Sequence, residues 1–284
     1  MSEQLSYNIN PSDTEKKEAE QPTSVAIQSG ETEAKIVPEK GWTSEFSYKG
    51  ESLFYAVGDF SGKSVRGGNF PAFPNFGPDT LLGQHGFARN NAWTWDKQTE
   101  NSVELSFKPG NVKDRELDNL YPYDFENKMN ISVGDKSIKY DFLVKNNGDK
   151  KLPTTLGFHP FFAIDNDIEK QVTTNLEGFN LEGRTWEKSK DGHLSLPLYD
   201  IPESGLIEIN VPGKGTFKMN VSPEFKKVLV WKEIGADFLC FEPIIALNED
   251  DITNNAINVE GMRLDVDPKS EVNLGMEISF ESEE

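Results

Sequence analysis

Residues 129–144 decide the class of fold, and they read MNISVGDKSIKYDFLV. In the second half, apolar residues stand at every second position from 138 to 144, which puts them on one face of an extended strand. The first half repeats this spacing at positions 129, 131 and 133. A Gly-Asp pair at 134–135 lies between the two halves and favours a tight turn. The stretch therefore predicts a β-hairpin with one apolar face.

The same alternation continues on both sides of this hairpin, between turns rich in Gly, Asn, Asp and Pro. It is seen at Val103, Leu105 and Phe107; at Ile207 and Ile209; at Phe217, Met219 and Val221; and at Val272, Leu274, Met276 and Ile278. Two short continuous apolar runs, 228–231 and 238–241, are typical of strands buried on both faces. No long amphipathic helix and no repeat of fixed period stand out. The pattern predicts an all-β protein with a single large antiparallel domain over residues 34–284.

Residues 1–33 differ in composition from the rest of the chain. They are rich in Glu, Ser, Thr, Gln and Lys and contain one aromatic residue, Tyr7. Few apolar side chains are available there to offset the entropy of ordering the backbone. We expect an acidic flexible N-terminal tail, although a strand could start within it and pair with the domain.

The charge of the chain limits the kinds of partner. Lys and Arg number 29 against 48 Asp and Glu, so the net charge is −19. Proteins that bind nucleic acid or a membrane surface usually carry a basic patch or a basic amphipathic helix, and neither is visible. We expect no nucleic acid and no membrane as partners. An anionic small ligand would need local Arg or Lys residues to hold it against this acidity.

The chain also carries signals of its compartment. Cys240 is the single cysteine, so no intrachain disulfide can form. The first residues contain no apolar segment of a secretory signal, and no stretch approaches the ~18 apolar residues of a membrane span. These features favour a cytoplasmic location.

His159 is the first polar residue in unusual surroundings. It is preceded by Phe158 and followed, after a proline, by Phe161 and Phe162. Burial there would lower its pKa unless a carboxylate compensates, and an imidazole that titrates near neutrality is a suitable general acid or base. The alternative is a hydrogen-bonded core histidine. His193, in Asp-Gly-His, looks like a surface turn residue.

Glu242 is the second such residue. It ends the apolar run 238–241 and is followed by Pro243, which cannot continue a ladder of hydrogen bonds. A buried carboxylate is costly unless it is paired or hydrogen-bonded. Glu242 is therefore either part of a structural ion pair or a functional carboxyl group with a raised pKa at the sheet rim.

The chain has a second histidine and two arginines in glycine-rich surroundings. Arg66 precedes two glycines, and His85 and Arg89 lie in the segment HGFAR. Gly neighbours let a ligand approach the backbone, and an Arg fork can bind hydroxyl pairs or phosphate. The alternative for each Arg is an ordinary surface ion pair. Three scattered His residues do not suggest a metal site.

Four segments occur in an order that resembles the aldose 1-epimerase and hexose-6-phosphate 1-epimerase families. Residues 65–77 read VRGGNFPAFPNFG, residues 85–89 read HGFAR and are followed by Trp93, residues 157–162 read GFHPFF, and residues 241–243 read FEP. Together they span about 180 residues. Asn69 stands where these families usually have an apolar residue.

This resemblance implies a galactose mutarotase-like β-supersandwich and a set of roles. Glu242 would be the general base that takes the proton of the anomeric hydroxyl, and His159 the general acid for the ring oxygen. Arg66 and His85 would bind the sugar, and Arg89 would help to hold an anionic group. Asp200 is a candidate for the Asp that binds ring hydroxyls.

The implied activity is isomerisation of a carbohydrate. It interconverts the α and β anomers of a hexose or hexose 6-phosphate and needs no metal and no cofactor. We expect a sugar or sugar phosphate as ligand and a monomer or weak homodimer. The residues leave open whether the substrate is phosphorylated, and whether the domain only binds or senses a carbohydrate. A glycosidase with paired carboxylates fits poorly, because the four segments supply one Glu and two His.

Overall fold

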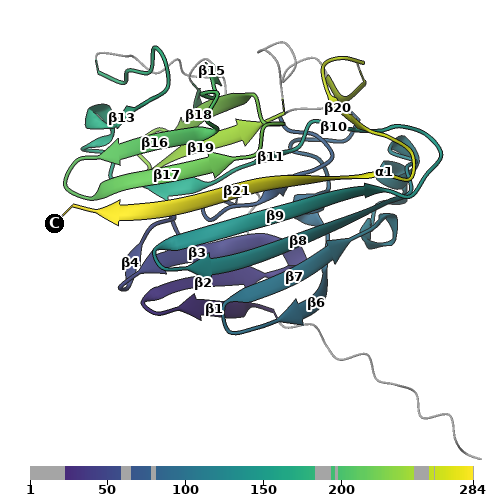
Figure 1. Cartoon of the computed structure of the whole chain (residues 1–284), viewed down its shortest axis with the longest axis horizontal. Helices are drawn as coiled ribbons and strands as arrows, with labels where there is room; N and C mark the ends of the chain where they lie inside the picture. Colours follow the sequence, from purple (N-terminus) through teal and green to yellow (C-terminus); the bar gives the residue numbers. More distant parts are fainter. Residues whose placement is uncertain are drawn as a thin grey trace, which may run out of the picture.

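A computed structural model describes residues 23–58, 65–77, 81–182, 193–195, 198–245, 256–258 and 260–283 (Figure 1). Almost all of its regular structure is strand. The single α-helix of the described residues is α1 (Arg115–Leu120), and the short 3₁₀ turns are η1 (Pro38–Lys40), η2 (Ala88–Asn90), η3 (Pro109–Asn111), η4 (Glu169–Gln171) and η5 (Ala256–Asn258). None of the helices in this part of the chain is long and apolar enough to span a bilayer. The predicted all-β class is confirmed.

An eight-stranded antiparallel sheet forms one layer (Figure 1). Its order is β13 (Thr173–Thr174), β16 (Leu206–Val211), β17 (Gly215–Val221), β21 (Glu271–Ser282), β9 (Ser137–Asn146), β8 (Phe125–Gly134), β7 (Ser102–Phe107) and β6 (Thr94–Gln98). The predicted hairpin is β8–β9, in which Ile131 faces Tyr140 and Met129 faces Phe142. Its alternating apolar residues are buried, as their spacing predicts.

A seven-stranded sheet forms the facing layer and carries the residues of interest. Its main path is β14 (His193–Ser195), β18 (Lys227–Glu233), β19 (Phe238–Ile244), β11 (Gly157–Phe158) and β5 (Pro71–Ala72); β12 (Phe161–Ala163) also pairs with β19, and β15 (Tyr199–Asp200) with β18. Every residue of β19 is buried, so the prediction of a strand covered on both faces is confirmed there. It is wrong for 228–231, because burial alternates along β18 and leaves Leu229 and Trp231 half-buried. His193 begins β14 rather than lying in a turn.

Two smaller sheets complete the fold. One has the order β1 (Val25–Ser29), β2 (Thr32–Val37), β3 (Trp42–Tyr48) and β4 (Glu51–Ser52), and the other joins β10 (Leu152–Thr154) to β20 (Leu264–Val266). Val25 and Ile27 are buried in the main core. The alternative that a strand starts within residues 1–33 and pairs with the domain is what the structure shows for β1, which pairs with β2. Residues 1–22 lie outside the described residues.

Aromatic side chains fill the space between the two large sheets. The ring of Phe158 lies 5.6 Å from that of Tyr140, and the ring of Phe162 lies 5.0 Å from that of Phe217. A second, smaller cluster covers the other face of the seven-stranded sheet: Trp42, Val57, Phe70, Phe161, Phe238 and Cys240. This second cluster surrounds the polar residues discussed below.

Gly68 joins the segment of Arg66 to the sheets. Its φ is +65°, and a Cβ atom there would overlap the carbonyl oxygen of Thr43. Its N–H donates a hydrogen bond to the carbonyl oxygen of Tyr55 at 2.7 Å. The close approach of these backbone segments is the physical reason for glycine at this position.

We predict that Gly68→Ala lowers the free energy of unfolding much more than Gly30→Ala. Gly30 has a similar φ of +59° but no atom within 4 Å of its added Cβ, so that variant should lose only the ~1–2 kcal/mol of left-handed strain. Gly68→Ala should lose about 1–3 kcal/mol more from the overlap. Urea denaturation of both variants measures the difference, and equal losses would contradict the packing argument.

Candidate active site

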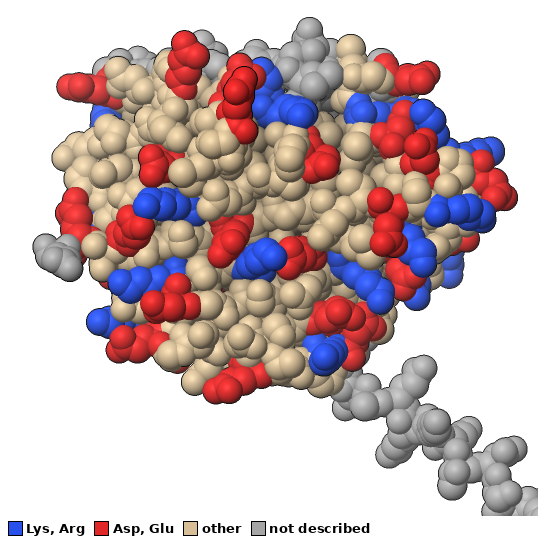
Figure 2. Space-filling model, viewed as in Figure 1, with Lys and Arg blue, Asp and Glu red and all other residues tan. Residues whose placement is uncertain are grey.

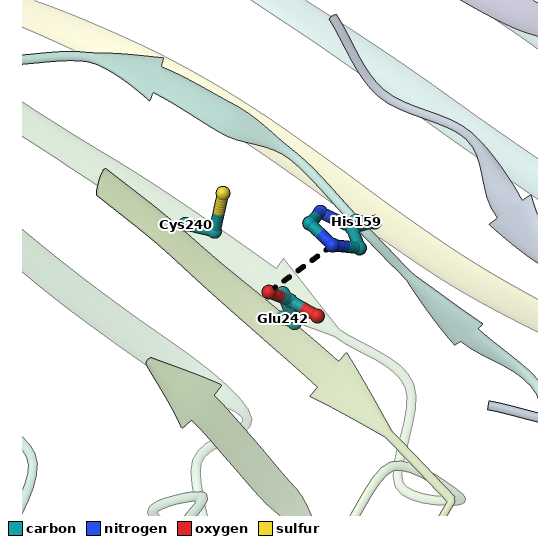
Figure 3. Close-up of side chains that lie close together, drawn as sticks. All are labelled: His159, Cys240 and Glu242. Carbon is teal, nitrogen blue, oxygen red and sulfur yellow. Dashed lines mark ion pairs between the residues drawn. The ribbon is translucent and has the colours of Figure 1, made fainter. Parts of the chain in front are cut away.

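Strand register brings Glu242 and His159 together. Gly157 of β11 pairs with Ile244 of β19, and Phe161 of β12 pairs with Cys240. Residue 159, halfway between 157 and 161, therefore stands opposite residue 242. The Nε2 atom of His159 lies 3.4 Å from Oε1 of Glu242 (Figure 3).

The backbone of His159 is fixed from the neighbouring segment. Its N–H donates to the carbonyl oxygen of Phe70 and to Oδ1 of Asn69, both at 3.1 Å. Asn69 was singled out in the sequence only as a departure from the family pattern. The structure gives its side chain a definite task, which is to hold the loop between β11 and β12.

The imidazole of His159 lies between aromatic rings. It stacks on Phe161 at 4.6 Å between ring centroids and on Phe70 at 4.9 Å, and the ring of Trp231 lies nearly perpendicular to it with a centroid distance of 5.7 Å. These contacts restrict the orientation of the ring and remove water from both of its faces. The imidazole can therefore exchange protons only along its edge, where Glu242 lies.

Burial dominates the electrostatics of this pair. The side chains of His159 and Glu242 are 8% and 1% exposed. Desolvation raises the pKa of Glu242 well above its usual value and lowers the pKa of His159 well below its own. The directions expected from sequence are confirmed. Both groups are driven towards their neutral forms. The one proton that they can exchange is then carried by the carboxyl group of Glu242, and His159 is a neutral imidazole.

His85 lies beside the pair, with its ring centroid 5.2 Å from that of His159. The backbone N–H of Gly77 donates to Nδ1 of His85 at 3.2 Å, so the neutral ring carries its proton on Nε2. Burial is the main cause that lowers the pKa of His85 well below its usual value, and the charges of Arg89 and Arg66 add to it. The site therefore holds His85 as a neutral hydrogen-bonding group.

Arg66 and Arg89 lie over aromatic rings around the pair. Arg66 is 5.2 Å above Trp231, and its Nε donates to Oε2 of Glu233 at 2.9 Å. Arg89 is 4.4 Å above Phe70, and burial, with the charge of Arg66 second, lowers its pKa to about 10. Both guanidinium groups act electrostatically on His85 and His159. They form a local positive region in an acidic protein.

Asp200 is not brought into this buried cluster. Its side chain is 82% exposed and accepts a hydrogen bond from Nζ of Lys227 at 2.6 Å. Asp200 pairs with Lys227, and Lys227 with Ile244, which lies two residues beyond Glu242 on β19. The role suggested for Asp200 stays a prediction. Lys227 was missed, since nothing in its local sequence links it to the motifs.

Cys240 is the other neighbour that sequence reasoning missed. It stands two residues before Glu242 on β19, so both side chains leave the same face of the strand (Figure 3). One ligand-type atom each of His159, Cys240 and Glu242 lies within 4.8 Å of the other two. The i, i+2 spacing on a predicted strand was the signal available in the sequence.

Comparison with known proteins identifies the family. A family model described as aldose 1-epimerase matches residues 31–220, more than half of the chain. The chain belongs to the aldose 1-epimerase family. The matched segment includes Arg66, His85, Arg89, His159 and Asp200, and it ends before Glu242.

This chain matches curated relatives over only part of their length. Protein LacX of Lactococcus lactis subsp. lactis is 33% identical over 130 residues, which are 45% of this chain and 39% of that protein. A protein of Escherichia coli (strain K12), provisionally named a glucose-6-phosphate 1-epimerase, is 32% identical over 120 residues, which are 41% of this chain and 38% of that one. The chain thus matches about two fifths of the length of these curated relatives.

Solved structures extend the similarity to the whole fold. The Slr1438 protein of Synechocystis sp. PCC 6803 has a TM-score of 0.77 at 21% identity. The superposition covers 98% of this chain and 100% of that protein's chain. A galactose mutarotase related enzyme of Lactobacillus acidophilus has a TM-score of 0.71 at 17% identity, covering 91% and 97%. The galactose mutarotase-like fold expected from the sequence is confirmed.

We predict that His85 makes the protein less stable towards acid. Above pH 7 the ring is neutral in both the folded and the unfolded state. As the pH falls through about 6.5, the unfolded state binds a proton and the folded state does not, so the free energy of unfolding decreases. Between pH 7.5 and 5.5 the loss from this residue should reach about 1 kcal/mol.

The matched variant for this test is His85→Asn, because Asn tolerates the φ of +59° found at this position. Urea denaturation at the two pH values should show a smaller acid-induced loss in the variant. An equal loss in both proteins would mean that His85 is protonated in the folded state.

Proposed function

We propose that this aldose 1-epimerase family member interconverts the α and β anomers of a hexose or hexose 6-phosphate by opening and reclosing the pyranose ring. The observation that carries the proposal is the 3.4 Å approach of His159 Nε2 to Glu242 Oε1 in a buried, aromatic-lined site. Mutarotation needs one proton removed from O1 and one delivered to O5. A pair of groups that shares a single proton can do both.

Substrate binding would convert the neutral pair into its working form. Neither carboxylate oxygen of Glu242 has a hydrogen-bond partner among the described residues. Sugar hydroxyls that donate to these oxygens would favour the carboxylate, and the proton would pass to His159. Glu242 then takes the proton of the anomeric hydroxyl while His159 protonates the ring oxygen. The C1–O5 bond breaks to give the aldehyde, and rotation about C1–C2 before closure gives the other anomer.

The surrounding polar groups would bind and polarise the sugar. Neutral His85 and the guanidinium of Arg66 are suited to hydroxyl and ring oxygen acceptors, and Trp231 offers a half-buried ring surface on the same sheet face. Asp200 remains a candidate for a ring hydroxyl at the edge of this surface. The predicted cytoplasmic location and the monomeric or weakly dimeric state are parts of the proposal that need their own experiments.

A phosphorylated substrate is the finer part of the proposal. Its support is the positive region formed by Arg66 and Arg89 and the name of the Escherichia coli relative. Arg89 is half-buried within a chain of net charge −19, and an anionic ligand would balance its charge.

We expect Glu242→Gln and His159→Asn each to lower the rate of anomer exchange by at least ~10², since a positioned proton-transfer group contributes about 10²–10⁴. NMR exchange spectroscopy between the two anomers measures the rate. Glu126→Gln is a matched control, because Glu126 is an ion-paired carboxylate on β8, and it should keep the normal rate. A near-normal rate in either site variant would overturn the assigned role, and sugar binding without exchange in the wild type would support the carbohydrate-sensing alternative.

We further expect glucose 6-phosphate to exchange at least ~10-fold faster than glucose at equal subsaturating concentrations, because a charge-assisted contact to phosphate is worth about 1.5–3 kcal/mol. Arg89→Met should remove most of this preference while exchange of free glucose persists. Equal rates for the two sugars would assign the protein to free aldoses.

A further inference from the structure

We propose that a thiophilic divalent cation, with zinc as the type case, binds between His159, Cys240 and Glu242 and blocks the acid/base pair. The blocking effect rests on the function proposed above, whereas the binding does not. Nothing in the aldose epimerisation chemistry needs the thiol. The site is thus a second use of residues that the sheet brings together for another reason.

The distances suit a tetrahedral ion. In such a site, nitrogen and oxygen ligands lie about 2.0–2.1 Å from zinc and therefore about 3.3 Å from each other. The corresponding atoms of His159 and Glu242 are 3.4 Å apart. A sulfur ligand at about 2.3 Å would lie about 3.5 Å from the other two ligands. The three ligand atoms lie within 4.8 Å of one another. A rotation of the Cys240 side chain that brings its sulfur closer would place the three atoms at three corners of a tetrahedron.

The ligand atoms are buried and free to coordinate. Glu242 is 1% exposed, and both of its oxygens lack a hydrogen-bond partner among the described residues. Cys240 is a free, buried thiol that points to the same side of β19 (Figure 3). An unpaired carboxylate in such surroundings is costly, and a metal ion would satisfy it.

The chemistry of the three ligands selects the kind of ion. Imidazole and thiolate favour zinc and other soft or borderline cations over magnesium and calcium, which prefer oxygen. Binding releases two protons to solvent, one from the thiol of Cys240 and one from the carboxyl group of Glu242, and the thiolate and carboxylate charges then balance the two charges of the ion. Arg66 and Arg89 act electrostatically on this region and oppose the cation. The site should therefore bind zinc more weakly than a dedicated structural site.

Such an ion and the sugar would exclude one another. The metal takes the Glu242 oxygen and the His159 nitrogen that the proposed reaction uses for proton transfer. Three protein ligands leave a fourth tetrahedral position, which water could take. Removal of the metal by a chelator should restore anomer exchange.

Cobalt provides a direct test that involves no sugar. Cys240 is the only cysteine in the chain, so any thiolate-to-cobalt charge-transfer absorption must come from this residue. We expect the wild-type protein, titrated with Co²⁺, to show this absorption and the visible bands of tetrahedral cobalt at one equivalent, and to lose both on addition of Zn²⁺. Cobalt bound without the charge-transfer absorption, or at many equivalents, would mean adventitious binding by surface acids and would overturn the proposal.

Variants then identify the ligands. Cys240→Ala should abolish the charge-transfer absorption, and Glu242→Gln should weaken Co²⁺ binding at least 10-fold, while Glu126→Gln should leave it unchanged. Equal affinity in wild type and Glu242→Gln would exclude the carboxylate as a ligand. If Cys240→Ala fails to fold, the wild-type absorption still decides the question.

A separate assay tests the blocking effect. Zn²⁺ should inhibit anomer exchange in the wild type, and Cys240→Ala should need at least 10-fold more Zn²⁺ for the same inhibition. If cobalt binds as expected but no exchange is observed without metal, the proposed function fails and the metal site stands. If exchange is normal and no charge-transfer absorption appears, the metal site fails and the proposed function stands.

Discussion

The approach of Glu242 to His159 depends on the burial of one strand, β19. All seven of its residues are buried, with Leu239 and Phe241 in the main core and Cys240 on the opposite face. A strand in this position fixes the register of its neighbours, because a shift of one residue would turn its apolar side chains away from the core. The register that seals the core therefore also sets Glu242 opposite residue 159.

This position makes the carboxyl group chemically unusual. An exposed glutamate would be fully ionised at neutral pH, whereas desolvation on β19 raises the pKa of Glu242 well above its usual value. The stacked rings of Phe70 and Phe161 remove water from His159 in the same way and lower its pKa. These opposite shifts favour the proton on the carboxyl group over the imidazole, the reverse of the order in water.

Much of the fold follows from local sequence, but the site does not. Alternation predicted the β8–β9 hairpin because one face of that sheet is buried and the other is not. Composition assigned Val25–Ser29 to the tail, although these residues pair with β2, and the continuous apolar run 228–231 wrongly predicted burial of Trp231, whose side chain lies on the site face of β18. His159 and Glu242 are 83 residues apart, so only the family motifs suggested that they meet. Cys240 could have been found from its spacing to Glu242, whereas the pairing of Asp200 with Lys227 needed the register of β15.

Charge is organised on two scales in this molecule. Over the surface, acidic and basic side chains are interspersed and the acids prevail, as Figure 2 shows for one face. Within the site, Arg66 and Arg89 act on both histidines and disfavour a positive charge on either. An imidazolium at His159 thus becomes favourable only when negative charge enters nearby, either as the Glu242 carboxylate or as an anionic group of a ligand. Under the proposed function, an anion bound by Arg66 and Arg89 would in this way help His159 to carry the proton that ring opening needs.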